Sequence, residues 1–259
     1  MSIIDIRNLS HRFSNGQTGL KDISLSVDSG EFVILAGLNG SGKTTLIKHL
    51  NGLLMPSRGA VFIDGVPVKQ NILNARKQVG MVFQDADSQI VGETVYADVA
   101  FGPENLGLSR DEIHRRVMAA LEKVGLQHLG DSRPHRLSGG EKKRLAIAGV
   151  LAMTPRILVF DEPFANLDYS GTLQILSHII DLHAAGITIF VSSHDLDWFI
   201  KPATRLILME KGQIAGDGKP ETLLHQARNM GIIKGIDRPT VRPSDCKAVQ
   251  LSDCPTVRP

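Results

Sequence analysis

The stretch GLNGSGKTT at positions 37 to 45 constrains the fold of this chain more than any other feature. An apolar run, EFVILAG, leads into it, and a helical pattern, KTTLIKHLNGLL, follows. Gly37, Gly42, Lys43 and Thr44 occupy the positions of the phosphate-loop pattern. Glycines let the backbone turn so tightly that its N–H groups face one anion, and the helix adds its positive N-terminal end. A strand, this loop and a helix in succession therefore predict a nucleotide-binding α/β domain.

The side chains of this loop fit the same chemistry. Lys43 can place its charge on the terminal phosphates of a nucleotide, and the Thr44 hydroxyl can bind Mg²⁺. An incidental glycine-rich turn is the alternative. The strand before the loop and the helix after it argue against that alternative.

Hydrophobic patterns predict two kinds of sheet. EFVILAG, VGMVFQ, RILVFDE and ITIFVSSHD are apolar without alternation, which indicates parallel strands covered on both faces. DISLSV alternates apolar and polar residues and GAVFIDG reads as a short strand, so a small antiparallel sheet is expected near the N-terminus. LILMEKGQIAGDG predicts a hairpin that turns at Lys211 and Gly212. Helical patterns, such as RDEIHRRVMAALEKVGL and SGTLQILSHIIDLHAAG, lie between the strands. A helix-rich insert is expected between about residues 86 and 155.

Length and composition describe one globular domain with a tail. A chain of 259 residues can bury a full core, and we expect this domain to span residues 1–234. PTVRPSDC is echoed by SDCPTVRP near the end, a Pro-rich repeat without a core pattern, so residues 235–259 are expected to be a disordered tail. A thiol-based metal or redox role of Cys246 and Cys254 is the alternative.

Charge and hydropathy argue against several classes of function. The net charge is +2 without a Lys/Arg block, so nucleic acid is not an expected partner. Apolar runs stay shorter than the roughly 18 to 20 residues of a membrane span. The N-terminus lacks the regions of a secretory signal, and a cytosolic location fits.

Two further strands end in residues that suit nucleotide hydrolysis. RILVFDE places Asp161 beside the expected metal, and Glu162 can accept a proton from an attacking water or orient it. VSSHD places His194 at the carboxyl end of another strand, where open α/β sheets bind ligands. The alternatives are a helix cap or a solvated loop for the acids and a structural role for the histidine.

RLSGGEKKRLAIAGVL contains a second amide-rich turn at the start of a helix, at Ser138, Gly139 and Gly140. One nucleotide does not need two such turns from one chain. Two copies that face each other do, because the second turn of each copy can close over the nucleotide of the other. A plain helix cap is the alternative for this turn taken alone.

Together these segments resemble the ATPase subunits of ATP-binding cassette (ABC) transporters. GLNGSGKTT resembles the Walker A motif, ILVFDE the Walker B motif, LSGGE the signature, ANLD at 165–168 the D-loop and His194 the switch histidine. The resemblance covers about residues 3–230. It implies a P-loop NTPase fold of the ABC ATPase type, with a RecA-like parallel-sheet core, an N-terminal antiparallel β subdomain and an inserted α-helical subdomain. It also implies a head-to-tail dimer that holds two ATP molecules.

The resemblance implies roles for individual residues. Residues expected to bind the nucleotide are Phe13, which would stack on adenine, Gly37, Asn39, Gly40, Ser41, Gly42, Lys43, Thr44 and Thr45. Residues expected to hold Mg²⁺ are Thr44, Gln84 and Asp161, and those expected to serve catalysis are Lys43, Gln84, Glu162 and His194. Residues expected to act at the dimer interface are Ser138, Gly139, Gly140 and Glu141 on the ATP of the partner, and Asp168 in communication between subunits.

One branch of the family fits best. VGMVFQDADSQIVGETVYADVAFGPENLGLSRDEI and LSGGEKKRLAIAGVLAM resemble the ATPases of energy-coupling-factor (ECF) transporters, which import vitamins or metal ions such as cobalt and nickel. This implies a peripheral ATPase on the cytoplasmic face of the membrane, paired with a second copy or a paralogue. The solute stays open, with a lean toward metal ions. Phe164 and Asn166, near the expected dimer seam, and Glu141 depart from the residues common in the family.

The segment 84–108 is expected to dock membrane subunits. Gln84 would report the presence of the γ-phosphate, and Val95 and Val99, four residues apart, can pack on one helical face. Glu93, Asp98 and Glu104 are expected to be exposed acids that receive arginines from the membrane subunits. Ordinary solvated charges are the alternative for each acid.

Other functions remain as alternatives. A different type of ABC transporter is one. A non-transport ABC ATPase acting on DNA or ribosomes is another, although such proteins usually carry tandem cassettes or basic arms. A nucleotide-binding regulatory module without turnover is the third, and Glu162 and His194 argue against it.

Overall fold

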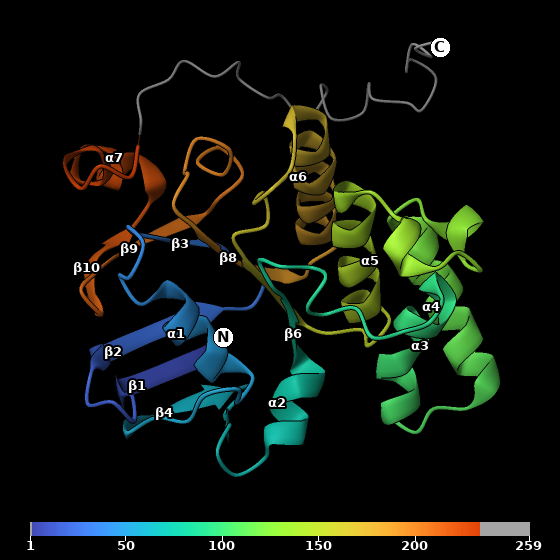
Figure 1. The fold of residues 1–259 in the computed structure, drawn as a ribbon. Helices are drawn as coiled ribbons and strands as arrows, with labels where there is room; N and C mark the ends of the chain where they lie inside the picture. Colours follow the sequence, from blue (N-terminus) through green and yellow to red (C-terminus); the bar gives the residue numbers. More distant parts are fainter. Residues whose placement is uncertain (1, 234–259) are drawn as a thin grey trace.

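The structure is a computed structural model that describes residues 2–233. The expectations for residues 235–259, including Cys246 and Cys254, lie outside this range. Within it, two sheets and several helices are arranged in layers (Figure 1).

The larger sheet has six strands in the order β10-β9-β3-β8-β7-β6. Its strands are β3 (Phe32–Ala36), β6 (Val79–Val82), β7 (Ile157–Asp161), β8 (Thr188–Ser193), β9 (Arg205–Glu210) and β10 (Gln213–Gly218). Strands β3, β6, β7, β8 and β9 run parallel, and β10 pairs antiparallel with β9. Every residue of β3, β6, β7 and β8 is buried, which is why these segments read as continuous apolar runs. The parallel sheet and the hairpin turn at Lys211 and Gly212 are confirmed.

The smaller sheet is antiparallel and has the order β2-β1-β4-β5. Its strands are β1 (Ser2–Arg12), β2 (Thr18–Asp28), β4 (Arg58–Ile63) and β5 (Val66–Pro67). The buried residues of β2 alternate with exposed ones, so one face of the sheet is packed and the other meets solvent. The expected antiparallel sheet near the N-terminus is confirmed.

Helix α1 (Lys43–Leu50) connects the two sheets. Leu46, Ile47 and Leu50 belong to one apolar cluster with side chains from β1, β2 and one face of the parallel sheet. The helix ends before Gly52, which has a φ of 71°, so it is shorter than the helical pattern that continues to Leu54. Because α1 is packed on both sides, the start of this helix is held firmly at the carboxyl end of β3.

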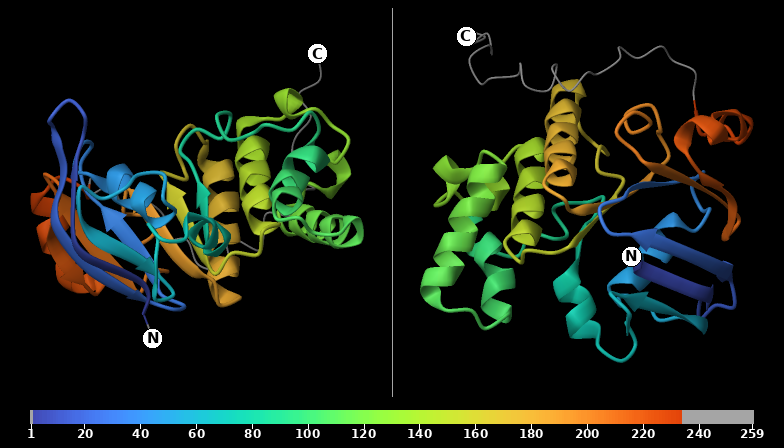
Figure 2. Two further views of the ribbon diagram at one scale, coloured as in Figure 1. Left: turned by 90° about the horizontal axis from the view of Figure 1, so that it is seen from below. Right: turned by 180° about the vertical axis from the view of Figure 1, so that it is seen from behind.

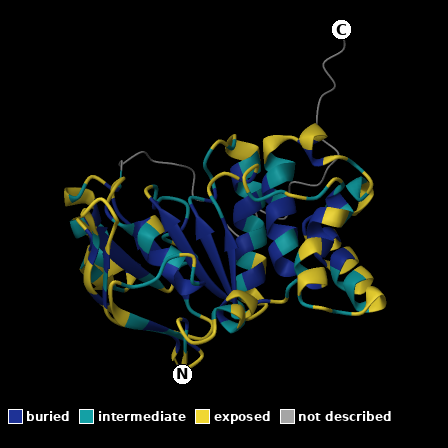
Figure 3. Ribbon diagram, turned by 60° about the horizontal axis from the view of Figure 1, so that its bottom comes forward, coloured by how far each residue is buried: buried dark blue, intermediate teal, exposed yellow. Residues whose placement is uncertain are grey.

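The other face of the parallel sheet is covered by helices that lie on the far side from the antiparallel sheet (Figure 2). Between β6 and β7 these are α3 (Val95–Asn105), α4 (Arg110–Lys123), the short helices η1 (Gln127–Leu129) and η2 (Pro134–Arg136), and α5 (Gly139–Leu151). Helices α6 (Tyr169–Ala184) and α7 (Pro220–Asn229) contribute to the same core. Helix α2 (Ile72–Gln78) instead packs its buried Ala75 into the cluster on the side of the antiparallel sheet. Buried residues concentrate in the strands and in the inward faces of these helices (Figure 3).

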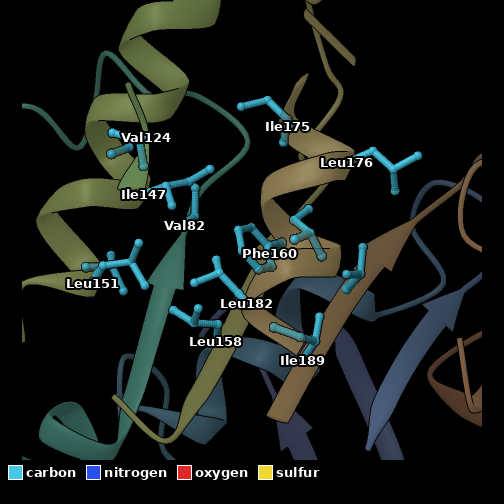
Figure 4. Close-up of a cluster of buried hydrophobic side chains, with 14 of the residues drawn as sticks. Val82, Val124, Ile147, Leu151, Leu158, Phe160, Ile175, Leu176, Leu182 and Ile189 are labelled. Carbon is cyan, nitrogen blue, oxygen red and sulfur yellow. The ribbon is translucent and has the colours of Figure 1, made fainter. Parts of the chain in front are cut away.

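The core under these helices is continuous. Figure 4 shows Phe160 and Leu158 of the sheet in one cluster with Ile147 and Leu151 of α5 and Leu182 of α6. Among the described residues, no helix is both long and apolar enough to cross a membrane. Because this core is continuous, the sheet is a rigid base. The loops at the carboxyl ends of its strands are where functional residues are expected.

Candidate nucleotide-binding site

The loop between β3 and α1 is shaped by glycines that its surroundings require. A Cβ on Gly37 would lie 2.5 Å from both the carbonyl oxygen of Met209 and the hydroxyl of Ser41. Gly42 has a φ of 105°, in the left-handed region that side chains disfavour. In the described part of the chain, α1 has no side-chain N-cap and no acid in its first turn. Its N–H groups are therefore free to bind an anion from outside.

Two other features of the loop fit a phosphate ligand. The hydroxyl of Ser41 is buried and has no hydrogen-bond partner among the described residues. Lys43 is buried, and its ammonium donates to the carbonyls of Gly37 (2.7 Å) and Leu38 (3.3 Å). Burial lowers the pKa of Lys43, while the charges of Glu162 and Asp161 oppose that shift. A phosphate group would supply the negative charge and the acceptor that these buried donors call for.

Asp161 at the end of β7 is surrounded by hydroxyl groups. The Thr44 hydroxyl lies 3.0 Å from Asp161 Oδ2, and the Ser192 hydroxyl donates to Oδ1 at 2.5 Å. Asp161 is buried, so its charge depends on these contacts. A carboxylate beside a threonine hydroxyl is an oxygen donor set of the kind Mg²⁺ uses together with phosphates.

Glu162 and His194 form a pair at the same edge of the sheet. Glu162 has a left-handed φ of 47°, and its N–H donates to the carbonyl of Ser192 at 3.0 Å. This bend turns its side chain toward His194, whose Nδ1 lies 2.8 Å from Glu162 Oε2. Lys43 Nζ is 3.8 Å from Glu162 Oε1. The structure therefore brings Lys43, Glu162 and His194 together, as expected for strand ends in an open α/β sheet.

Phe13 and the tip of the phosphate loop complete the surroundings of the start of α1. The Phe13 ring contacts His11 edge to face at 4.7 Å between centroids. A Cβ on Gly19 would lie 2.7 Å from the Phe13 ring and 3.3 Å from the Thr45 side chain, so Phe13 lies close to the first turn of α1. Asn39 and Gly40 are exposed at the tip of the loop. This placement is compatible with a base beside Phe13 and phosphates at α1.

Gln84 is exposed just beyond β6, the neighbour of β7 in the sheet. Its carbonyl accepts a hydrogen bond from Lys143 of α5 at 2.7 Å, and the carbonyl of Phe83 accepts another at 3.1 Å. Burial lowers the pKa of Lys143 to about 8. Lys143 is not predicted from the sequence, because a charge inside a basic helical segment is typical of a solvated side chain. Its position four residues after Gly139, on a helix that packs against β6, was the available signal.

The signature turn forms contacts of its own. Ser138 is the N-cap of α5 and makes a capping box with Glu141, whose carboxylate accepts from the Ser138 N–H (2.8 Å) and hydroxyl (2.7 Å). A Cβ on Gly139 or Gly140 would meet no other atom within 4 Å among the described residues. The signature turn contributes no side chain to the cluster at Lys43. The side chains of that cluster come from β7 and from the loops after β7 and β8. A cleft of about 70 Å³ joins Gly139 with Gln84 and the loop at Asn166.

One expectation for the segment 84–108 is wrong. Asp98 is not an exposed acid, since only 8% of its surface is accessible. Its carboxylate accepts hydrogen bonds from the backbone N–H groups of Val91 (2.7 Å) and Gly92 (2.9 Å), so it closes the loop before α3. Glu93 and Glu104 are exposed as expected. The expected packing of Val95 and Val99 is confirmed, because both are fully buried.

Comparison with known proteins agrees with this geometry. A family model described as ABC transporter matches residues 20–165, which is more than half of the chain. The chain belongs to the ABC transporter family. As a member, it is an ATP-binding protein whose ATPase activity is coupled to transport.

Individual relatives narrow the branch to the ECF type. The energy-coupling factor transporter ATP-binding protein EcfA of Methanocaldococcus jannaschii is 45% identical over 224 residues, 85% of this chain and 80% of the relative. A putative ABC transporter ATP-binding protein of Halobacterium salinarum is 48% identical over 84% of this chain and 94% of its own length. The solved structure of cbiO1 from Clostridium perfringens, described as part of the ABC transporter complex cbiONQ, matches with a TM-score of 0.80. It is 38% identical and covers 88% of this chain and 92% of its own.

Proposed function

We propose that this chain is the motor subunit of an ECF-type importer and that its site hydrolyses Mg²⁺-bound ATP. The observation that carries the proposal is the meeting of Lys43, Glu162 and His194 beside the phosphate loop. Lys43 neutralises the terminal phosphates of ATP. Glu162 orients the attacking water and accepts its proton, and His194 holds the Glu162 carboxylate in position.

Mg²⁺ would be held by the Thr44 hydroxyl and by Asp161 and Gln84, and it supplies charge neutralisation on the phosphate oxygens. The Ser192 hydroxyl keeps the Asp161 carboxylate oriented. Gln84 is tied through its backbone to Lys143 of α5, so a change at the Gln84 side chain can reach the helical layer. Phe13 stacks on the adenine, and Asn39, Gly40, Ser41 and Thr45 complete the loop around the phosphates.

Two cassettes are proposed to share their nucleotides. The turn made by Ser138, Gly139, Gly140 and Glu141 is open to the outside, which suits binding the ATP of a partner cassette. Asp168 caps α6 by accepting from the N–H of Gly171 at 2.7 Å, and this loop is proposed to communicate between the cassettes. The partner is a second copy of this chain or a paralogue.

The segment 84–108 is proposed to dock the membrane subunits. Val91 and Phe101 are 63% and 53% exposed, a large apolar surface for side chains of this kind, and Glu93 and Glu104 lie nearby in the chain. Such a surface fits an amphipathic segment that carries arginines. Docking there would place this chain at the cytoplasmic face of the membrane as a peripheral subunit.

The solute is proposed to be a transition-metal ion, cobalt or nickel, or a vitamin. The membrane partners would select it, since none of the sites proposed for this chain binds the solute.

Two substitutions test the proposed site. Glu162→Gln is expected to keep ATP binding, to lose nearly all turnover, and to trap a dimer in ATP and Mg²⁺. Lys43→Ala is expected to weaken ATP binding by about a hundredfold, because it removes a charge-assisted contact from a buried site. Calorimetric titration, phosphate release and light scattering, with a candidate partner cassette also supplied, measure these effects.

Parent-rate hydrolysis by Glu162→Gln would contradict its role, and unchanged affinity in Lys43→Ala would contradict the placement of the phosphates. Purification from a membrane extract tests the docking proposal. The expected result is that membrane transport subunits are recovered with the parent chain and lost from the double variant Val91→Asp, Phe101→Asp. Recovery with both proteins would refute the docking surface.

A further inference from the structure

Four aromatic side chains gather where the loop after β7 meets the loop after β8. The rings of Phe164 and Phe199 are stacked, with centroids 4.7 Å apart and an angle of 6° between their planes. Phe164 also meets Trp198 edge to face at 5.9 Å, and Trp198 lies 5.6 Å from Tyr169. The two loops are therefore joined by ring contacts as well as by the hydrogen bond of Glu162 with His194.

Phe199 is the fixed member of the stacked pair. Its side chain is fully buried and meets the ring of Phe32 in β3 at 6.2 Å. Its N–H donates to the carbonyl of Leu196 at 2.9 Å, and its own carbonyl accepts from the N–H of Ala203. Because Phe199 is part of the core, a ring stacked on it is tied to the central sheet.

The loop that carries Phe164 needs such an anchor. Glu162 and Asn166, on either side of Phe164, have φ values of 47° and 62°. The left-handed region is unfavourable for side-chain-bearing residues, and such residues persist only where their surroundings hold them. Within the loop, the N–H of Ala165 bonds to the Glu162 carbonyl at 3.1 Å and that of Leu167 to the Phe164 carbonyl at 3.3 Å. These local bonds shape the turn, and the bond from the Glu162 N–H to the Ser192 carbonyl ties only the first residue of the loop to the sheet.

We infer that Phe164 is a positioning residue, whose stack on Phe199 holds the Glu162 carboxylate against His194. The inference rests on the proposed role of Glu162 in orienting water. Phe164 follows Glu162 by two residues, so a shift of its ring moves the backbone that carries the carboxylate. Since water must be held in a narrow geometry for attack, a small displacement of Glu162 lowers the rate without removing ATP binding.

Phe164→Leu tests the inference, because leucine keeps an apolar side chain and removes the ring. We expect kcat to fall about fivefold to tenfold, because the energy of one aromatic pair, added to the activation barrier, slows a reaction by about this factor. The KM for ATP and the Tm should stay near those of the parent. Phe164→Tyr retains the stack and should keep the parent kcat. Phe62→Leu, the same change at a half-buried phenylalanine of β4, is the matched control and should also keep it.

Trp198 provides a local readout, since it is the one tryptophan of the chain. Its fluorescence should change in Phe164→Leu and stay that of the parent in the two other variants. A parent kcat in Phe164→Leu, or an equal loss in Phe164→Tyr, would overturn the positioning role. Glu162→Gln, measured in parallel, separates this failure from failure of the proposed function, because an active Glu162→Gln would refute the role of Glu162 itself.

Discussion

The two glycine-rich turns of this chain look alike in sequence and differ in how they are built. Both stand at the N-terminus of a helix, one before α1 and the other before α5. Around the first, a Cβ on Gly37 would collide with the carbonyl of Met209 at 2.5 Å. Around the second, a Cβ on Gly139 or Gly140 would have no described atom within 4 Å apart from its chain neighbours and the backbone of its own helix. The first turn is packed and the second is open.

Their electrostatics differ in the same way. The turn before α1 contains the buried ammonium of Lys43 and no acid in the first helical turn, so it presents positive charge. The turn before α5 is occupied by its own Glu141, which accepts two hydrogen bonds from Ser138. One chain therefore builds a complete cradle for phosphate at α1 and an independent, self-capped turn at α5. This difference is consistent with the proposal above that the second turn acts on the nucleotide of a partner cassette.

Adding a methyl group to each turn should have opposite effects on stability. Gly37→Ala is expected to lower the free energy of unfolding by about 3 kcal/mol, because its Cβ meets backbone that cannot move aside. It should also abolish ATP binding. Gly140→Ala should raise stability by up to about 1 kcal/mol through helix propensity and leave ATP binding to the monomer intact. It should nevertheless prevent the ATP-dependent dimer in the Glu162→Gln background.

Denaturant unfolding and light scattering measure these effects. If Gly140→Ala lost as much stability as Gly37→Ala, the second turn would be packed within its own chain. The two turns would then not differ as the structure indicates. An undisturbed dimer of that variant would show that the turn does not approach a partner.

Lys143 joins α5, the helix of the open turn, to the backbone beside the nucleotide site at Phe83 and Gln84. The pH dependence of the unfolding free energy should show whether its amine is buried there. Burial lowers its pKa to about 8 from the 10.5 of an ordinary lysine. Between these two values the unfolded chain keeps the proton that the folded chain has lost. Stability therefore rises with pH in this window, by about 2 kcal/mol relative to a variant without the amine.

Lys143→Met supplies that reference, and unfolding free energies of both proteins at pH 7.5 and 9.5 give the difference. Lys142→Met is the control on the same helix, since it removes an ion pair with the exposed Asp87 instead of a buried amine. If the gap between the parent and Lys143→Met stayed constant with pH, Lys143 would not be buried as the structure places it.

The packed region was the easier one to predict from sequence. Apolar runs that end in Asp161 and in the SSHD segment predicted parallel strands and the edge where they meet, and these features are local to each segment. Asp98 shows what a local pattern cannot tell. Its carboxylate turns back to the N–H groups of Val91 and Gly92, a contact set by the loop before α3. A charged residue beside a helix start reads as exposed unless the path of that loop is known.

Lys143 and Phe164 escaped prediction for a related reason. The partners of Lys143 are carbonyls about 60 positions earlier in the chain, and the partner of Phe164 comes from the loop after another strand. Every residue has a backbone carbonyl, so no sequence motif predicts which carbonyls a buried lysine will contact. The sequence shows Phe164 as a departure from a family pattern, whereas the structure shows the ring it stacks on.

The smallest expected effect concerns Glu141, the acid that makes the open turn self-capped. Its pKa lies below the usual value; burial opposes this shift, and the hydrogen bonds from the Ser138 hydroxyl and N–H outweigh it. Glu141→Gln keeps a side chain that can complete the capping box but removes the charge. Stability at neutral pH should fall by about 0.5 kcal/mol, because a carboxylate in the first turn favours the helix.

The same change should strengthen ATP-dependent dimerisation about threefold to tenfold, since a carboxylate beside the phosphates of a partner repels them. Sedimentation at low and high salt, in the Glu162→Gln background, measures this effect. The gain should shrink at high salt, because screening weakens the repulsion in the parent. Glu122→Gln, an exposed acid on α4, is the control for the loss of one charge. A weaker dimer in Glu141→Gln would mean that the carboxylate itself serves the interface, and the open turn would then need its acid as much as its glycines.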